Sequence, residues 1–177
     1  MYQIRIPMKT KHIILFILCI LPMINFAQNL NQKIIEPKKQ EEILIGLCDE
    51  TGLKTVGEFG IMFPLEYNYY KPAEQYMSVL KDKLSGYKIT IVFGTWCGDS
   101  KEQMPRFFKI LDMTGYDNTT LKLIAVDRDR KAGAMDIADL KIEKVPTIIL
   151  YKDGKEVGRI IETPKSSLEQ DLAEMMP

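Results

Sequence analysis

The stretch Ile89-Thr90-Ile91-Val92-Phe93-Gly94-Thr95-Trp96-Cys97-Gly98-Asp99-Ser100 carries the features that decide the fold. Its first five residues are β-branched or aromatic, and such a run is typical of a strand on a covered surface. After Cys97 the apolar residues recur at spacings of three and four, which predicts a helix running to Leu111. The chain is therefore expected to pass from a buried strand through a tight turn into a helix, with a cysteine at the helix N-terminus.

Cys97 is the candidate nucleophile, because the unpaired N–H groups and the dipole of a helix N-terminus stabilise an anionic thiolate. Ser100 lies on the same helix face and can donate a hydrogen bond to the thiolate, and Lys101 adds a positive charge. Asp99 acts against both, since a neighbouring carboxylate destabilises a second anion. The alternative is a buried and inert cysteine, but a structural cysteine does not usually follow a tryptophan at the start of a helix.

Three motifs carry a family resemblance. Trp96-Cys97-Gly98-Asp99-Ser100, with Pro105 after it, resembles the redox turn of the thioredoxin superfamily, in particular of its secreted members. Val145-Pro146-Thr147 resembles the superfamily's loop with a cis-proline, and Asp153-Gly154 is similar to the hairpin turn that follows. The resemblance runs from Pro72 to Met176. It implies an α/β, thioredoxin-like fold, in which a central mixed sheet has helices on both faces and follows an N-terminal extension.

The resemblance also assigns roles to the site residues. Cys97 would attack disulfides, and Trp96 would flank it as an apolar contact surface. Val145 and Pro146 would align an extended substrate strand, because a cis X–Pro bond holds the preceding backbone open for pairing. These residues predict a site for protein disulfides.

The sequence departs from thioredoxin at three positions. The second cysteine of the family's motif is Ser100, and the family's buried acid and its lysine partner are replaced by Ile91 and Leu123. A hydroxyl does not compete in thiol–disulfide exchange at neutral pH. A mixed disulfide must therefore be cleared by a second thiol of the substrate, by a small-molecule thiol or by Cys48. The preferred interpretation of Cys48 is a buried residue in an apolar run.

The first 27 residues have the layout of a secretory signal peptide. A basic segment ending at His12 precedes the apolar run Ile13–Leu21, and Asn25-Phe26-Ala27-Gln28 offers a small residue at the cut. Because the run is too short to span a bilayer comfortably, we expect a cleaved signal and export to the periplasm or the extracellular space. Cys19 raises the alternative of a membrane-retained precursor, although Leu18 before it is bulkier than a lipidation signal requires.

Removal of residues 1–27 leaves 21 basic and 24 acidic side chains, a net charge of −3 without a basic stripe. Neither nucleic acid nor an anionic membrane surface is therefore an expected partner. The single histidine, His12, leaves with the signal, so that Cys48 and Cys97 remain without any histidine. This composition excludes the usual Cys/His zinc sites and Cys–His catalytic pairs, and we expect no metal and no cofactor.

The predicted organisation is a signal peptide over 1–27, an N-terminal extension over 28–71 and a thioredoxin-like domain over 72–177. In the extension, Gln28–Glu42 reads as a linker or frayed segment, and Ile43–Cys48 as either a strand or a helix. Thr51–Tyr70 is expected to be irregular and to pack its aromatic rings on the domain. The alternative for this stretch is a substrate-facing rim of tyrosines.

In the domain, a strand, a helix and a second strand joined by a short return predict a right-handed parallel crossover. The charged stretch Arg128–Lys144 is interpreted as a solvated connection. The further expected elements are a helix over Pro72–Leu84, a strand over Leu121–Asp127, a helix around Ala132–Leu140, a hairpin of Ile148–Tyr151 with Glu156–Ile161, and a last helix opened by a capping box at Ser166-Ser167-Leu168-Glu169.

The leading functional hypothesis is an exported thiol–disulfide oxidoreductase or isomerase that acts on protein disulfides through Cys97. Its partners would be protein thiol or disulfide substrates and an external thiol reductant, and no oligomeric state is assigned. The alternative is a thioredoxin-fold module that has lost turnover and holds peptides as a chaperone does. A peroxidase fits less well, because the expected threonine and arginine around the thiol are missing.

Overall fold

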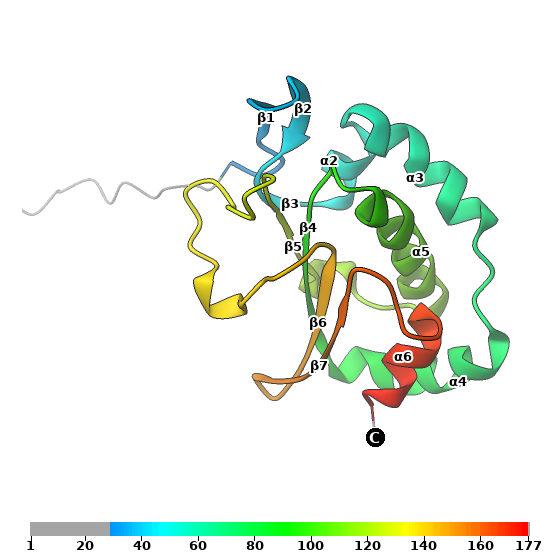
Figure 1. Ribbon diagram of the computed structural model, residues 1–177. Helices are drawn as coiled ribbons and strands as arrows, with labels where there is room; N and C mark the ends of the chain where they lie inside the picture. Colours follow the sequence, from blue (N-terminus) through cyan, green and yellow to red (C-terminus); the bar gives the residue numbers. More distant parts are fainter. Residues whose placement is uncertain (1–28, 177) are drawn as a thin grey trace, which may run out of the picture.

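The computed structural model describes residues 29–176, and its centre is a five-stranded mixed sheet with the strand order β3-β5-β4-β6-β7 (Figure 1). β4 (Lys88–Phe93) is the strand predicted at Ile89–Phe93, and every residue in it except Lys88 is buried. The other strands are β3 (Gly46–Cys48), β5 (Lys122–Ala125), β6 (Thr147–Lys152) and β7 (Lys155–Ile161). The predicted signal peptide, residues 1–27, lies outside the described residues.

The pairing of the strands places the end of β4 in the middle of the sheet. β4 runs parallel to β5 and antiparallel to β6, and α5 (Gly98–Thr114) makes the crossover between the parallel pair. The predicted crossover is therefore confirmed. The predicted hairpin of β6 and β7 is also confirmed, and it turns at Asp153 and Gly154, which both have positive φ.

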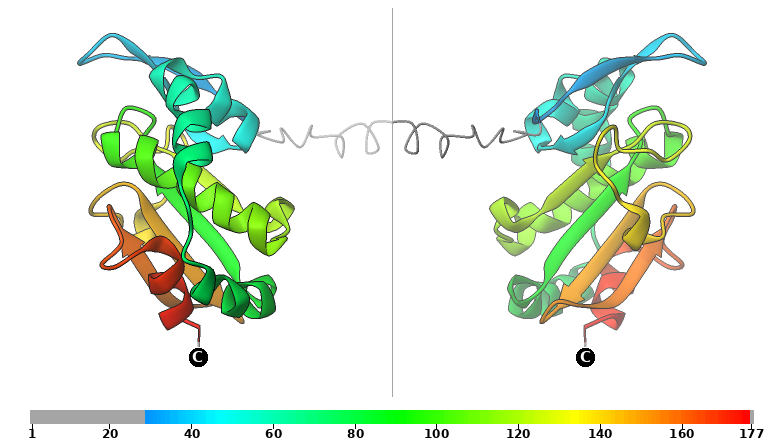
Figure 2. Two further views of the ribbon diagram at one scale, coloured as in Figure 1. Left: turned by 90° about the vertical axis from the view of Figure 1, so that its right-hand side faces the viewer. Right: turned by 90° about the vertical axis from the view of Figure 1, so that its left-hand side faces the viewer.

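The α-helices gather on one face of the sheet (Figure 2). Alternate residues of β4, among them Ile89, Ile91 and Phe93, point into this helical layer and form the larger apolar core with it. Within residues 29–176, the α-helices besides α5 are α2 (Glu50–Lys54), α3 (Gly57–Tyr69), α4 (Glu74–Lys83) and α6 (Leu168–Glu174). The expected α/β fold with a mixed central sheet flanked by helices is confirmed, but within residues 29–176 the α-helices lie on one face of the sheet and not on both.

The opposite face of the sheet is covered by the segment 127–146 (Figure 2). Val92, Ile124 and Val126 lie on this face and form a second, smaller apolar cluster. The helix predicted around Ala132–Leu140 is wrong, because only the 3₁₀ turn η4 (Ala138–Leu140) forms there. Gly133 has a φ of +66° within the predicted helix, and such a left-handed conformation interrupts helical hydrogen bonding.

The linker predicted over Gln28–Glu42 is also wrong, because β1 (Lys33–Glu36) and β2 (Glu41–Leu44) form an antiparallel hairpin there. Several of its polar residues form ion pairs, such as Lys33 with Glu42 and Lys38 with Asp129. Glu36 is buried and accepts a hydrogen bond from Arg128 at 3.3 Å. The undecided stretch Ile43–Cys48 contributes the end of β2 and β3 to the structure.

The irregular stretch predicted over Thr51–Tyr70 is helical instead, as α2 and α3. Two of its aromatic rings pack on the domain as expected: Phe59 lies against Phe93, and Phe63 lies against Phe108. Gly60, which reads as a helix breaker, is required by packing, since an added Cβ would lie 2.5 Å from the Lys54 carbonyl oxygen.

Candidate functional site

Cys97 lies at the end of the turn that connects β4 to α5. It is the N-cap residue of α5, with an extended backbone, and its N–H donates to the Gly94 carbonyl at 2.9 Å. Its own carbonyl accepts the first helical hydrogen bond, from Lys101 N–H at 3.1 Å. The side chain is half-buried. The thiol therefore lies at a helix N-terminus, as the sequence predicts, within reach of solvent.

The predicted proline loop lies directly beside this thiol. The Val145–Pro146 peptide bond is cis. The Cys97 thiol donates a hydrogen bond to the Val145 carbonyl oxygen, with 3.2 Å between sulfur and oxygen. The structure thus brings together two segments that the sequence separates by 48 residues.

Ser100 occupies the first turn of α5 and is fully buried. Its hydroxyl oxygen accepts a hydrogen bond from the Gly94 N–H at 3.3 Å. Within residues 29–176, the structure holds no hydrogen bond between Ser100 and the Cys97 sulfur. The serine therefore supports the turn that presents the thiol, and its hydroxyl proton is not used by the bond to Gly94.

Trp96 forms the apolar surface next to the thiol. Its indole N–H donates to the Val126 carbonyl at 2.8 Å, and the Arg128 guanidinium lies over the ring, 4.8 Å from the ring centroid. A Cβ on Gly94 would lie 2.5 Å from the indole, so that glycine is required under the ring. Arg128 lies in the charged stretch Arg128–Lys144, which the sequence predicts to be a solvated connection, and no local signal marks it as a residue of the site.

The charged residues of the first turns of α5 have partners of their own. Lys101, expected to supply positive charge to the thiol, pairs with Glu58 of α3, and this hydrogen bond and charge lower the pKa of Glu58. Glu102 pairs with Arg106 one turn further along α5.

Cys48 lies apart from this site. It is buried in β3, opposite Leu123 of β5, and belongs to the larger core on the helical face. Cys97 packs against the smaller cluster on the other face, and both thiols are free. Burial raises the pKa of the Cys48 thiol to about 12, although the Ala125 N–H acts in the opposite direction.

The positions of the family's proton-handling pair are apolar and buried. Ile91 of β4 and Leu123 of β5 are register partners in the sheet, and both are buried. The sheet beneath the thiol therefore offers no carboxyl group at these two positions.

The described residues give two further findings. In the range 29–176, no group of three or more histidine, cysteine or acidic side chains is arranged to hold a metal ion. No helix in that range combines the length and the apolar content that crossing a bilayer demands.

A half-buried thiol at the start of a helix, in contact with the carbonyl before a cis-proline and next to the central strand of a mixed sheet, defines a protein of the thioredoxin-like class. Comparison with known families agrees: the thioredoxin family model matches residues 72–174, and the chain belongs to that family.

Individual relatives support the same assignment. Thioredoxin-2 of Saccharomyces cerevisiae is 32% identical over 106 residues, which are 58% of this chain and 92% of that protein. A thioredoxin of Mycobacterium tuberculosis is 31% identical over 103 residues, 56% of this chain and 84% of that protein. A solved structure of a Pseudomonas aeruginosa protein of unknown function shares the fold, with a TM-score of 0.52 at 14% identity over 71% of this chain and 80% of that one.

Proposed function

We propose that the protein carries out thiol–disulfide exchange on protein disulfides with Cys97 as its single nucleophile. One observation carries the proposal: the Cys97 sulfur lies 3.2 Å from the carbonyl oxygen that precedes a cis-proline. A substrate strand that pairs with the Val145 backbone would bring its own sulfur to the same place. Membership of the thioredoxin family supports this chemistry.

The reaction starts from the Cys97 thiolate, which attacks one sulfur of a substrate disulfide. A Cys97–substrate disulfide forms, the substrate S–S bond breaks, and the second substrate sulfur leaves as a thiolate that takes up a proton. The unpaired N–H groups of the first turn of α5 favour the negative charge on the attacking sulfur. Ser100 supports the turn through its bond to the Gly94 N–H, and the structure holds no hydrogen bond from its hydroxyl to the Cys97 sulfur among residues 29–176.

The mixed disulfide must be broken by a thiol outside the motif, because Ser100 has a hydroxyl at the position of the family's resolving thiol. Attack by another thiol of the same client isomerises the client's disulfides. Attack by an external thiol on the Cys97 sulfur releases the reduced client and leaves a disulfide between Cys97 and that thiol. A second external thiol then breaks this bond, which frees Cys97 and leaves the two external thiols joined as a disulfide. We assign no resolving role to Cys48, since it is buried in the other core and its raised pKa keeps it protonated at neutral pH.

The proposal is tested by incubating the reduced protein with a peptide that carries a mixed disulfide and following the covalent adduct by mass spectrometry. The wild type and Cys48→Ala should form the adduct, whereas Cys97→Ala should not. Peptide retained by Cys97→Ala without covalent capture, at wild-type affinity, would instead support a peptide-binding, chaperone-like module. Equal rates of peptide disulfide cleavage by Cys97→Ala and the wild type would overturn the proposal.

We also propose that the protein is exported and acts in the periplasm or the extracellular space. The support is the pattern of residues 1–27, in which a basic segment, the apolar run Ile13–Leu21 and a small residue at Ala27 follow one another. Expression of the full chain in a Gram-negative host should yield a periplasmic product whose N-terminal residue is Gln28. A cytoplasmic product that retains residues 1–27 would contradict this proposal.

A further inference from the structure

The N-terminal hairpin of β1 and β2 reaches the redox turn, although it precedes the segment that matches the thioredoxin family. The backbone N–H of Leu44, at the end of β2, donates to the Thr95 hydroxyl at 3.2 Å, and both residues are buried. Thr95 lies between Gly94 and Trp96. The hairpin is therefore bonded directly to the turn that carries Cys97.

A second connection runs through Arg128. Its guanidinium bonds to Glu36 of β1, at 3.3 Å, and to Glu41 of β2. The Glu36 side chain is only 3% exposed, and its carboxylate also accepts the N–H groups of Lys38 and Lys39 in the hairpin turn. Because Glu36 is fixed in this way, it fixes the guanidinium that it binds.

The fixed guanidinium covers one face of the Trp96 indole, while Gly94 approaches the ring closely. The indole N–H is bound to the Val126 carbonyl. The ring is therefore oriented by three neighbours, and Arg128 is the one that depends on the hairpin.

We propose that Arg128, held by Glu36 and Glu41, is a positioning residue that orients Trp96 for contact with a client polypeptide, and that the hairpin is thereby part of the redox site. The client contact rests on the proposed function. Without the guanidinium, the indole loses a cation–π contact. At a half-exposed site such a contact favours the observed ring orientation over others by roughly two- to fivefold. The ring then samples other orientations, and the surface offered to a client beside Cys97 becomes less defined.

Trp96 is the single tryptophan of the chain, so that its fluorescence reports on this position alone. Arg128→Met keeps an apolar stem but removes the charge. We expect the tryptophan emission to shift to the red and the acrylamide quenching constant to rise by about two- to fivefold. Circular dichroism should show that the variant is still folded. Glu41→Gln should shift the emission in the same direction by less, and Arg128→Lys should restore part of the wild-type emission.

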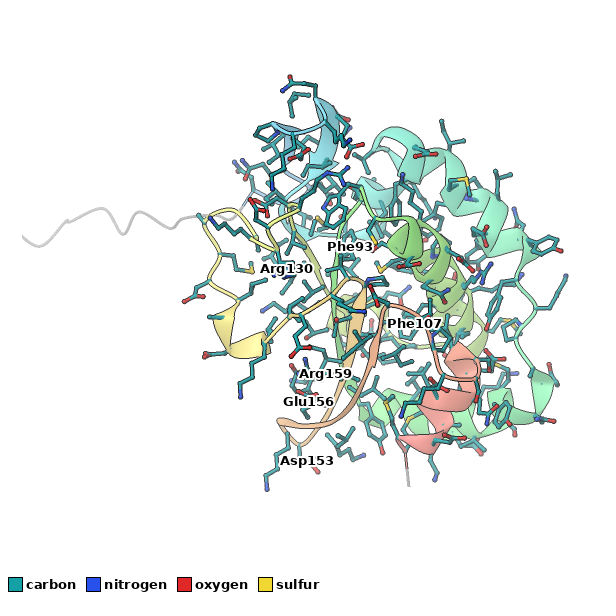
Figure 3. All side chains as sticks on the ribbon, viewed as in Figure 1. Phe93, Phe107, Arg130, Asp153, Glu156 and Arg159 are labelled. Carbon is teal, nitrogen blue, oxygen red and sulfur yellow. The ribbon has the colours of Figure 1, made fainter. Side chains whose placement is uncertain are left out.

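Arg159→Met is the matched control. Arg159 also pairs with a glutamate, Glu156, and is buried to a similar extent, but it lies on the edge strand β7, which β6 separates from β4 and Phe93 (Figure 3). The tryptophan emission and the acrylamide quenching of Arg159→Met should equal those of the wild type. Wild-type emission and quenching in Arg128→Met would overturn the proposal.

The role of Arg128 in client contact is tested by measuring, in stopped-flow experiments, how fast Cys97 reacts with two different disulfides. Arg128→Met should react about two- to fivefold more slowly with a mixed-disulfide peptide and unchanged with the small neutral 2,2′-dithiodipyridine. Equal slowing with both disulfides, or with neither, would overturn the positioning role. If the wild type itself does not react with the peptide, the proposed function fails, whereas the emission of Arg128→Met still decides whether Arg128 orients Trp96.

Discussion

The sulfur of Cys97 lies 3.2 Å from the carbonyl oxygen of Val145 and donates a hydrogen bond to it. This contact joins the start of α5 to the cis-proline loop before β6. A substrate sulfur that bonds to Cys97 must approach beside this carbonyl. The attacking atom and the backbone that would align a client strand therefore form one site, and the chemistry of that site depends on which thiol breaks the mixed disulfide.

Replacing Ser100 by cysteine should convert the site to one that resolves its own mixed disulfide. Ser100 is fully buried in the first turn of α5, three residues after Cys97, and cysteine has nearly the same shape. In the peptide exchange reaction, the wild type should accumulate the adduct. Ser100→Cys should release the peptide and form a disulfide between positions 97 and 100, which mass spectrometry detects. Ser100→Ala is the control and should accumulate the adduct as the wild type does; equal accumulation in Ser100→Cys would contradict the prediction.

Cys48 should resist alkylation in the folded protein. Burial raises the pKa of its thiol to about 12 in the folded state, against an ordinary value of 9.0, so that the reactive thiolate is scarce at pH 8. Its contribution to stability is full below pH 9 and is lost as the pH rises towards 12, because the unfolded chain releases this proton first. Iodoacetamide labelling of Cys48 in Cys97→Ala at pH 8, read at that residue by peptide mass spectrometry, should be negligible when the protein is folded and complete in urea. Equal labelling rates in both states would show that Cys48 is accessible.

The sequence predicts the thioredoxin-like core well, because the local pattern of apolar residues there matches the surfaces that are buried in the folded protein. The β-branched run before Gly94 forms the central strand, and the apolar spacing after Cys97 forms the face of α5 that packs on the sheet. Asp153-Gly154 gives the hairpin turn directly, since both residues adopt the positive φ that the pair favours.

The extension is mispredicted for the opposite reason. Glu36 reads as a solvated charge, yet it is buried because its partner Arg128 comes 92 residues later, a pairing that local sequence does not contain. Gly60 reads as a helix breaker, yet the close approach of the Lys54 carbonyl requires it within α3. The contact between Glu36 and Arg128 joins distant segments, so local sequence predicts neither the burial of Glu36 nor the role of Arg128. At Gly60, the close packing of the neighbouring helices α2 and α3 overrides local propensity.

Glu169 should contribute to stability as an ion. It is buried, and its carboxylate accepts hydrogen bonds from the Tyr70 hydroxyl at 2.6 Å and from the Ala73 N–H at 2.9 Å. Burial by itself would raise the pKa of Glu169, but these hydrogen bonds outweigh it and lower the pKa. The stabilisation is therefore present above the ordinary pKa of 4.5 and is lost as the pH falls through the folded-state pKa.

Glu169→Gln should accordingly lower the free energy of unfolding at pH 7 by about 1–3 kcal/mol in urea titrations. The difference from the wild type should shrink as the pH falls below 4.5. Glu174→Gln, on the exposed side of α6, is the matched control and should change stability by less than about 0.5 kcal/mol. A pH-independent difference for Glu169→Gln would show that charge is not the cause.

Gly94→Ala should disturb the redox turn through Trp96. An added Cβ would lie 2.5 Å from the indole carbon Cε2, and the ring is held on its other sides by the Val126 carbonyl and Arg128. We expect a loss of about 1–3 kcal/mol in unfolding free energy and a shifted tryptophan emission, because the ring or the turn must move. Gly98→Ala, one residue after Cys97, is the control, since an added Cβ there meets no atom within 4 Å, and its stability and emission should stay at the wild-type values or stability should rise slightly. If Gly94→Ala and Gly98→Ala melt and fluoresce alike, the indole moves freely over Gly94 and the close approach does not fix its orientation.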